Sequence, residues 1–517
     1  MHKGDIIEGT ITELRFPNKG LLRTGEGPSC TEVLVKNTIP GQRVSARITK
    51  KRSARAEANL ISVLTPSPLE ITPACPKFGS CGGCQYLCLP EEEELRIKEE
   101  QVRSLLRTAD SNVDQWYEGI LESPVTEGYR NKMELTFGDE EKDGPLTLGM
   151  HCRGSFYDVT NADTCRLVDA DYRKIIRAAR EYWAGTGVSF YHRLRRKGYL
   201  RHLLIRKGMK TGEILVDLIT TGQIPDPGSD TTGRNRGPEE STGAAAWADP
   251  VQSLPPEREN ELLTGFCSAL LSLDLDGAIC GILHTRNDSI ADIVEDQGTE
   301  ILYGKGSFNE ELLGLDFTVT PFSFFQTNSA GAELLYKTAG NYILHSEAME
   351  VGGTSRAGED PPRAAADGRK PVVFDLYCGT GTISLLVAPA ASKVIGVEIV
   401  EEAVLAAREN AVRNGVTNCE FIAGDVLEVI DTVEEQPDLI ILDPPRDGVH
   451  PKALPKILRC GVPYILYISC KPTSLVRDLP ILREWGYEPI RGVSINEFPK
   501  TANVETVLLL SQRKAGA

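Results

Sequence analysis

Two residues near the C-terminal end of the chain, Cys470 and Glu505, could together do chemistry on a pyrimidine base. Carbon 5 of uracil is too weak a nucleophile to attack a sulfonium methyl group, but a thiolate that adds to carbon 6 turns carbon 5 into an enolate-like nucleophile. A base must then remove the carbon 5 proton so that the thiol can leave. Cys470 ends an apolar segment and Glu505 opens another, so they are the candidate nucleophile and base. From its position alone, Cys470 is equally well interpreted as a buried, inert cysteine.

A glycine-containing turn at 375–382 indicates a nucleotide pocket. It reads Asp-Leu-Tyr-Cys-Gly-Thr-Gly-Thr and follows an apolar segment, and Glu398 ends the next such segment, where a carboxylate can bind ribose hydroxyls. A dinucleotide site of the G-x-G-x-x-G type has a third glycine where this chain has Ser384. Since that glycine is less needed when no diphosphate is bound, the turn favours S-adenosylmethionine over a dinucleotide.

A second turn, Asp443–Pro444–Pro445–Arg446, follows another apolar segment. Enzymes that methylate the amino group of a base carry an aromatic residue after the prolines, which stacks on the flipped base. Arg446 occupies that place here, so an exocyclic nitrogen is disfavoured as the methyl acceptor. Asp443 has a simpler interpretation as a residue that caps the turn before two prolines.

The elements that must position these residues alternate between strands and helices from residue 371 onward. The apolar segments are 372–376, 393–398, 438–443 and 464–470. Continuous apolar strands separated by helices predict a mainly parallel sheet that is covered on both faces, an α/β Rossmann-like domain.

The whole chain of 517 residues is long enough for several domains. Short alternating strands near the N-terminus predict a small β-barrel over 1–66, of the OB-like kind that often binds oligonucleotides. We expect a central α+β domain over 67–320 and the α/β domain over 321–517. Polar, Gly- and Pro-rich composition predicts insertions at 223–258 and 350–370.

Four cysteines stand at spacings typical of metal ligands. They are Cys75, Cys81, Cys84 and, far downstream, Cys165. Four thiolates suit zinc or a [4Fe–4S] cluster, and spacing alone does not choose between them. Cys88 lies nearby but does not fit the pattern.

The net charge of −16 argues against a polyanionic partner, although the local distribution does not. Residues 33–56 and the stretch between Glu181 and Glu213 are basic and free of acids, which predicts contacts with phosphates; solvated faces are the simpler interpretation. No apolar run approaches the ~20 residues of a membrane span, and the N-terminus has no secretory pattern. We therefore expect a cytoplasmic protein.

These motifs together resemble the RNA m5-uridine methyltransferase family, specifically its members with an N-terminal TRAM barrel and an iron–sulfur cluster, which methylate bacterial 23S ribosomal RNA. The resemblance covers nearly the whole chain except the two insertions. It rests on the segments Pro321–Asn328, Asp375–Gly381, Asp443–Arg446 and Ser469–Pro472 and on the terminal motif around Glu505.

The resemblance implies a role for each motif. Gln326, Tyr377, Glu398 and Asp443 would line the S-adenosylmethionine pocket. Cys470 would be the nucleophile and Glu505 the base. The four cysteines would hold a [4Fe–4S] cluster, with zinc as the alternative.

One residue departs from the family pattern, because many members have histidine where this chain has Asn503, so a proton relay through that position is not expected. The substrate implied is 23S rRNA, with transfer RNA or a cytosine C5 target as alternatives. A non-catalytic RNA-binding protein is an alternative of another class, but binding does not require Cys470 and Glu505. No obligate protein partner is evident.

Overall fold

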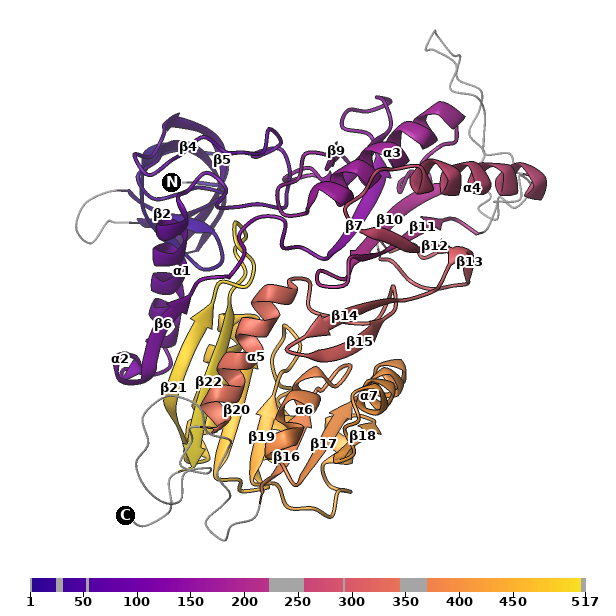
Figure 1. Ribbon diagram of the computed structural model, residues 1–517. Coiled ribbons are helices and arrows are strands. Elements are labelled where there is room, and N and C mark those ends of the chain that lie inside the picture. The colour runs from indigo at the N-terminus through magenta and orange to yellow at the C-terminus, as the bar shows by residue number, and fades with distance from the viewer. Residues whose placement is uncertain are drawn as a thin grey trace, which may run out of the picture.

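The N-terminal part of the chain is a closed five-stranded barrel (Figure 1). The computed structural model describes residues 2–24, 31–52, 55–222, 255–291, 293–344 and 370–512. The barrel strands are β1 (Ile6–Arg15), β2 (Lys19–Thr24), β3 (Thr31–Lys36), β4 (Arg43–Arg52) and β5 (Arg55–Thr65), in the order β1-β2-β3-β5-β4, and β1 closes on β4. Alternate apolar residues such as Val33 and Val35 fill its interior. The small barrel predicted from the sequence is confirmed.

A long segment connects the barrel to the rest of the molecule and carries three of the four candidate ligand cysteines. It leads into α1 (Glu91–Leu106), α2 (Val113–Trp116) and β6 (Tyr117–Leu121). These elements lie within the range expected for the central domain, yet β6 pairs in parallel with β21 and becomes the edge strand of the C-terminal sheet. Trp116 and Tyr117 pack in the core of that sheet.

The central domain is a seven-stranded sheet with two helices, α3 (Ala170–Thr186) and α4 (Pro256–Leu271), on one face (Figure 1). Its strand order is β13-β12-β11-β10-β7-β8-β9. The strands are β7 (Lys132–Gly138), β8 (Thr147–His151), β9 (Val159–Asn161), β10 (Leu200–Lys207), β11 (Glu213–Thr220), β12 (Ala278–Arg286) and β13 (Thr299–Gly304).

The two predicted insertions lie almost entirely outside the described residues. At 256–258 the prediction of an insertion is wrong, because these residues form the first turn of α4. Pro256 suits this turn, since the first amides of a helix have no partner within the helix.

The C-terminal domain is an eight-stranded sheet in the order β18-β17-β16-β19-β20-β22-β21-β6. Its strands after β6 are β16 (Val372–Leu376), β17 (Lys393–Glu398), β18 (Cys419–Ala423), β19 (Leu439–Leu442), β20 (Tyr464–Ser469), β21 (Tyr487–Ile495) and β22 (Glu505–Gln512). The strands β16 to β20 run parallel, whereas β22 is antiparallel to β20. The predicted parallel sheet is confirmed.

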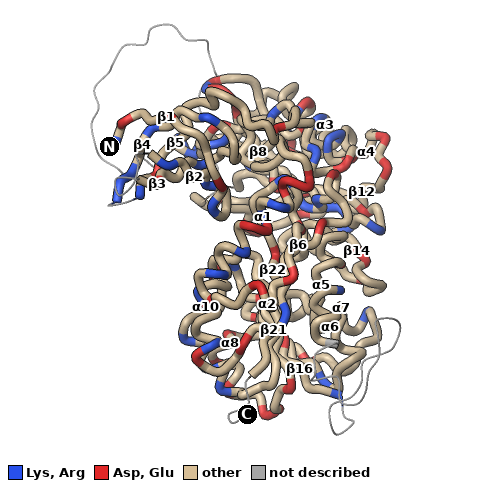
Figure 2. The backbone as a smooth tube through the Cα atoms, turned by 90° about the vertical axis from the view of Figure 1, so that its left-hand side faces the viewer, with Lys and Arg blue, Asp and Glu red and all other residues tan. Residues whose placement is uncertain are grey.

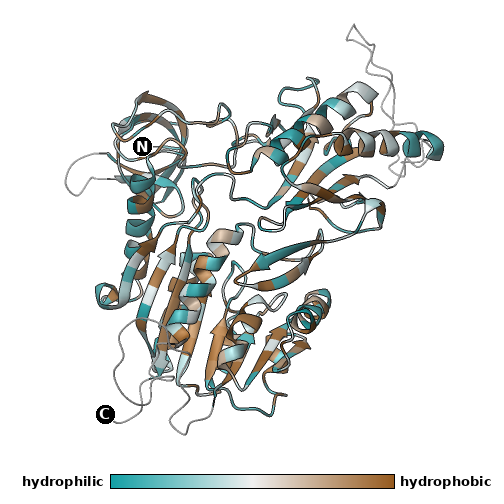
Figure 3. Cartoon of the chain, in the orientation of Figure 1, coloured by the Kyte–Doolittle hydropathy of each residue, from teal (hydrophilic) through white to brown (hydrophobic). Residues whose placement is uncertain are grey.

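Helices cover both faces of this sheet, and its central strands β19 and β20 are apolar along most of their length (Figure 3). One face packs against α5 (Ser329–Leu344), α6 (Thr382–Val387) and α7 (Glu401–Arg413). The other face packs against α1, α8 (Val426–Val429), α9 (Ala453–Leu458) and α10 (Pro472–Glu484). A small hairpin of β14 (Phe308–Leu312) and β15 (Leu315–Val319) joins the central and C-terminal domains. Burial on both faces explains why polar residues do not alternate with apolar ones along β19 and β20.

The two basic stretches differ in where they place their charges. Figure 2 shows Lys and Arg side by side on the barrel near β3 and β4, where Arg47, Lys50 and Arg52 are exposed. In the second stretch Arg206 and Lys207 are buried. Arg206 donates to carbonyl oxygens of the Thr320–Ser323 segment, and Lys207 pairs with Asp169 and Asp171. The phosphate-contact prediction is therefore wrong for these two residues, which hold the fold together instead. Among the described residues, no helix combines the length and the apolar character needed to cross a membrane.

Candidate active site

One edge of the C-terminal sheet gathers the predicted site residues from several strands. Parallel strands end at the same edge, so Tyr377 after β16, Glu398 at the end of β17, Asp443 after β19 and Cys470 after β20 meet there. Because β22 runs antiparallel to β20, its first residue, Glu505, also lies at this edge. Ser469 is opposite Thr506, so Cys470 and Glu505 are the next residues of the two neighbouring chain segments, and Glu505 is close enough to raise the pKa of Cys470.

The glycine turn after β16 is held in a tight conformation. Tyr377 has φ 71° and Gly381 has φ 81°, both in the left-handed region. A Cβ at Gly381 would lie 2.9 Å from the ring of Phe421, so only glycine fits there. The Glu398 carboxylate accepts hydrogen bonds from the backbone N–H of Gly379 (3.1 Å) and of Val400 (3.0 Å). The carboxylate is thereby fixed beside the turn.

Gln326 approaches this edge from the segment between β15 and α5. Its carbonyl accepts from the Asn131 side chain at 2.9 Å, and its own side chain hydrogen-bonds the buried hydroxyl of Tyr336. Burial raises the pKa of Tyr336 well above its usual value, and the nearby carboxyl group of Asp443 raises it further. Gln326 and Asp443 therefore both lie close to Tyr336.

The turn that carries Asp443 is tied to the turn that carries Cys470. The Ser474 hydroxyl donates to the carbonyl oxygens of Arg446 (3.1 Å) and Lys471 (2.7 Å). Pro472 starts α10 directly after these residues, which stops β20 at the thiol. The two motifs singled out in the sequence are thus one structural unit.

Electrostatically, the site is a group of acids in a desolvated environment. Burial raises the pKa of Glu505 to about 8 and that of Asp443 to about 7. Burial, with Glu505 and Asp443 adding to it, raises the pKa of Cys470 to about 12, while Arg446 acts in the opposite direction on both Cys470 and Glu505. A cationic ligand bound here would favour the ionised forms of all three groups.

Glu497 is a further acid of this site that sequence reasoning missed. It follows β21, is 0% exposed, and neither of its carboxyl oxygens has a hydrogen-bond partner among the described residues. Its Cγ lies 2.7 Å from where a Cβ of Gly331 would be, so that glycine makes room for it. Burial and the neighbouring Glu505 and Asp443 raise its pKa well above the usual value. A lone glutamate in a loop gave no signal of such burial.

Replacement of Glu497 by glutamine is expected to stabilise the fold, increasingly so as pH rises from about 5 to 8. The unfolded chain releases the Glu497 proton near its ordinary pKa of 4.5, whereas the folded protein keeps it to higher pH. The folded state then binds more protons, so stability falls as pH rises between the unfolded and the folded pKa. Glutamine removes this loss, and we expect a gain of roughly 2–4 °C in Tm at pH 8.

Thermal unfolding at both pH values measures this gain. Glu488→Gln is the matched control, because Glu488 is paired with Arg483 at 3.0 Å rather than buried beside other acids. A gain for Glu497→Gln that is equal at pH 5 and pH 8 would contradict the explanation.

The loop that leads to Glu505 is anchored by a buried ion pair. Lys98 on α1 is completely buried, pairs with Glu94 at 2.9 Å and donates to the Asn496 side chain at 2.6 Å. Glu94 in turn accepts from the backbone N–H of Lys500 at 2.7 Å. Removing one partner of such a pair leaves an uncompensated buried charge. The pair fixes the path of residues 496–503.

The segment 75–88, which carries Cys75, Cys81 and Cys84, contacts the barrel, the central domain and the C-terminal domain. The Tyr86 hydroxyl donates to the barrel carbonyl of Pro17 at 2.9 Å, and the Gly82 amide donates to the His151 carbonyl of β8 at 3.1 Å. The Gln85 amide donates to Lys500 at 2.9 Å, within the loop before Glu505.

The four candidate ligand cysteines are close enough to influence one another. Burial raises the pKa of Cys84 to about 12, and the thiols of Cys165, Cys81 and Cys75 raise it further. Even so, no group of three or more His, Cys, Asp or Glu side chains within the described ranges has an arrangement that could hold a metal ion. The donor types suit a metal, but the metal site predicted from the sequence is not shown.

Comparison with known proteins identifies part of the C-terminal domain as a methyltransferase domain. The family described as "Methyltransferase domain" matches residues 368–478, which include the glycine turn, Glu398 and Cys470. An uncharacterized RNA methyltransferase of Clostridium tetani is 42% identical, with 99% of each chain covered. One from Clostridium acetobutylicum is 41% identical with the same coverage. This chain therefore belongs to the family of RNA methyltransferases.

A solved structure shares the fold over the full length. It is the tRNA (uracil-54, C5)-methyltransferase of Pyrococcus abyssi in complex with S-adenosyl-L-homocysteine, with a TM-score of 0.67 and 24% identity. The match covers 98% of this chain and 100% of that one.

Proposed function

We propose that this enzyme methylates carbon 5 of a uridine in RNA, with S-adenosylmethionine as the methyl donor. The observation that carries the proposal is the approach of a thiol and a desolvated carboxyl group, Cys470 and Glu505, on neighbouring strands at the edge that also holds Asp443. A protein that only binds RNA would not need this pair.

The residues of the site act in a defined order. The Cys470 thiolate forms a bond to carbon 6, and the carbon 5–carbon 6 π electrons move toward carbon 5 and the adjacent carbonyl. Carbon 5 then forms a bond to the methyl carbon of S-adenosylmethionine, and the methyl–sulfur bond breaks so that S-adenosylhomocysteine leaves. The Glu505 carboxylate removes the remaining carbon 5 proton, and the electrons of that C–H bond restore the double bond as the thiolate leaves. The protein ends with Cys470 free and the proton on Glu505.

The donor pocket is formed by the glycine turn and its neighbours. S-adenosylmethionine supplies an electrophilic methyl group on a positively charged sulfur when it is bound. Glu398 would hold the ribose, Tyr377 and Gln326 would line the pocket, and Asp443 would lie near the sulfonium. Burial raises the pKa of Asp443 to about 7 and that of Glu505 to about 8, and a cation bound beside them would favour their ionised forms.

Bacterial 23S ribosomal RNA is the substrate that we favour, and transfer RNA is the second candidate because the Pyrococcus abyssi protein with the same fold is a transfer RNA enzyme. To test this, unmodified 23S rRNA and transfer RNA are incubated with methyl-labelled S-adenosylmethionine, and the digested nucleosides are analysed by mass spectrometry. Labelled 5-methyluridine from 23S rRNA is expected. Labelled 5-methylcytidine, or no transfer to any RNA, would overturn the proposal.

We also propose that Cys75, Cys81, Cys84 and Cys165 hold a [4Fe–4S] cluster, with zinc as the alternative. Their number and their thiol chemistry support it, as does the position of the first three in the segment that connects the barrel, β8 and the loop before Glu505. Because methyl transfer moves no electrons, the role of the cluster would be to hold these parts together.

Replacement of Cys81 by serine is expected to remove most of the bound metal, and with it the brown colour of an iron–sulfur protein. Without the metal, the barrel, β8 and the loop before Glu505 would be held together less firmly, so the Tm and the RNA affinity should also fall. Iron, zinc and acid-labile sulfide are measured after anaerobic purification. Cys88→Ser is the control, since Cys88 packs in a small apolar cluster beside the barrel. Full metal content in Cys81→Ser, or a metal-free wild type with unchanged stability and RNA affinity, would overturn this proposal.

A further inference from the structure

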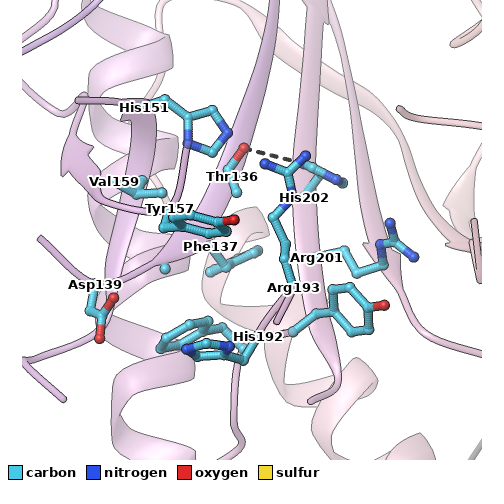
Figure 4. A pocket seen from close by; sticks show the side chains of 13 residues that line it. Thr136, Phe137, Asp139, His151, Tyr157, Val159, His192, Arg193, Arg201 and His202 are labelled. Carbon is cyan, nitrogen blue, oxygen red and sulfur yellow. Dashed lines mark hydrogen bonds between the residues drawn. The ribbon is translucent and has the colours of Figure 1, made fainter. Parts of the chain in front are cut away.

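The central domain contains a hollow that the proposed reaction does not use. It is a shallow hollow, open to solvent, at the end of the sheet where β7, β8 and β9 meet the segment before β10. Figure 4 shows side chains from these separate segments gathered around it, among them Tyr157, His192 and Arg193.

Rings form much of the lining of this hollow. Tyr157 is 52% exposed although it is a large aromatic residue, and nothing in the core requires it there. Phe190 and His192 stack on each other with ring centroids 6.4 Å apart and an angle of 24° between their planes. Half-exposed rings at the mouth of a hollow are the usual platforms on which unpaired bases stack.

Cations accompany the rings. The buried Arg201 guanidinium lies 4.5 Å from the centroid of the Tyr191 ring and donates to the carbonyl of Asn287 at 2.8 Å. Arg193 donates to the carbonyl of Phe156 at 2.8 Å, and this hydrogen bond connects the segment before β10 to the loop before β9. The exposed residues that follow are Leu194, Arg195, Arg196 and Lys197. Rings inside and positive charge on the rim match the chemistry of a nucleotide, which offers a flat base and an anionic phosphate.

The hollow is connected to the reaction edge through β10. His202 contributes to the lining, and Arg206 lies on the same face of the strand, four residues farther on. This separation is roughly 13 Å along a strand. Arg206 donates to the carbonyls of Thr320 and Ser323, in the segment that leads to Gln326. The hollow and the segment that leads to Gln326 therefore contact the same strand.

We infer that the hollow lined by Tyr157, His192 and Arg193 binds a second, unpaired nucleotide of the RNA substrate, by stacking of its base and by contacts of its phosphate with the basic rim. This inference rests on the proposed function only in taking RNA as the substrate. It means that the central domain binds a nucleotide of the RNA away from the methylated base. The inference does not depend on which base is methylated.

The test uses full-length protein as purified and a single-stranded RNA of about 12 nucleotides with one 2-aminopurine. Stacking on a protein ring changes the fluorescence of this base. Tyr157→Ala is expected to weaken binding about tenfold and to abolish the fluorescence change. Tyr157→Phe keeps the ring and should behave like wild type. Phe156→Ala is the matched control, because Phe156 is 78% exposed on the neighbouring position but does not line the hollow.

The outcomes separate this inference from the proposed function. Equal binding and equal fluorescence change for Tyr157→Ala and Phe156→Ala would overturn the inference, even if wild type makes 5-methyluridine. Weakened binding by Tyr157→Ala alone would support it, even if the methylated base proves to be another one. In steady-state assays the same variant should raise the KM for RNA and leave kcat and the KM for S-adenosylmethionine unchanged, because Tyr157 is not placed among the reacting groups.

Discussion

Replacement of Cys470 by alanine is expected to abolish methyl transfer, with a loss of roughly 10⁴- to 10⁶-fold, as is typical when the nucleophile of a covalent mechanism is removed. Without the bond to carbon 6, carbon 5 keeps its weak nucleophilicity and the methyl group has no acceptor. Binding of RNA and of S-adenosylmethionine should persist, because the substitution truncates one small side chain at the end of β20.

The clearest measurement uses RNA with 5-fluorouridine at the target position. Fluorine on carbon 5 cannot be removed as a proton, so wild type should be trapped as a covalent protein–RNA adduct that intact mass spectrometry detects. Cys470→Ala should give no adduct. Cys460→Ala is the matched control, since Cys460 is another half-buried thiol but precedes β20 and so lies toward the opposite edge of the sheet. An adduct with Cys470→Ala would assign the nucleophile elsewhere.

The architecture was largely predictable because each part has a strong local pattern. The apolar segments at 372–376 and 464–470 are strands that helices cover on both faces, and such burial leaves a continuous apolar run in the sequence. The pairing of β6 with β21 was not predictable. Ile120 lies opposite Ser494, far along the chain, and a short strand carries no signal for a partner at that distance.

The candidate site was predictable where function leaves a motif and not where only packing decides. Cys470 and Asp443 follow strands that run parallel, so a shared edge could be expected from chain order. The position of Glu505 depends on β22 entering antiparallel to β20, which no pattern in the sequence indicated. Glu497 and its supporting glycine, Gly331, meet only through tertiary packing.

Asn503 occupies the position at which the family resemblance implies histidine. The backbone N–H of Asn503 donates to the Thr501 hydroxyl at 3.2 Å, and this hydrogen bond lies within the turn before β22. The carboxyl groups that interact electrostatically with Glu505 are those of Asp443 and Glu497. The acid–base behaviour of this site is therefore set by a group of buried acids.

Replacement of Glu505 by glutamine is expected to slow turnover by about 10²- to 10⁴-fold, the usual contribution of a general base. Addition of Cys470 and methyl transfer do not need the carboxylate, whereas removal of the carbon 5 proton does. The variant should therefore accumulate an adduct with ordinary uridine RNA that already carries the methyl group. Its mass exceeds that of the unmethylated adduct by one methyl group in place of one hydrogen.

A second readout separates the base from a residue that only shapes the site. The ionised Glu505 carboxylate raises the pKa of the Cys470 thiol, and glutamine removes that effect. Because the pKa of Glu505 is about 8, alkylation of Cys470 by iodoacetamide should be faster in Glu505→Gln than in wild type, and the difference should grow as pH rises above that value. Glu402→Gln, which changes an exposed carboxylate on α7, should leave both turnover and alkylation unchanged. Rapid turnover by Glu505→Gln would remove Glu505 as the base, and slow turnover without the methylated adduct would assign it to an earlier step.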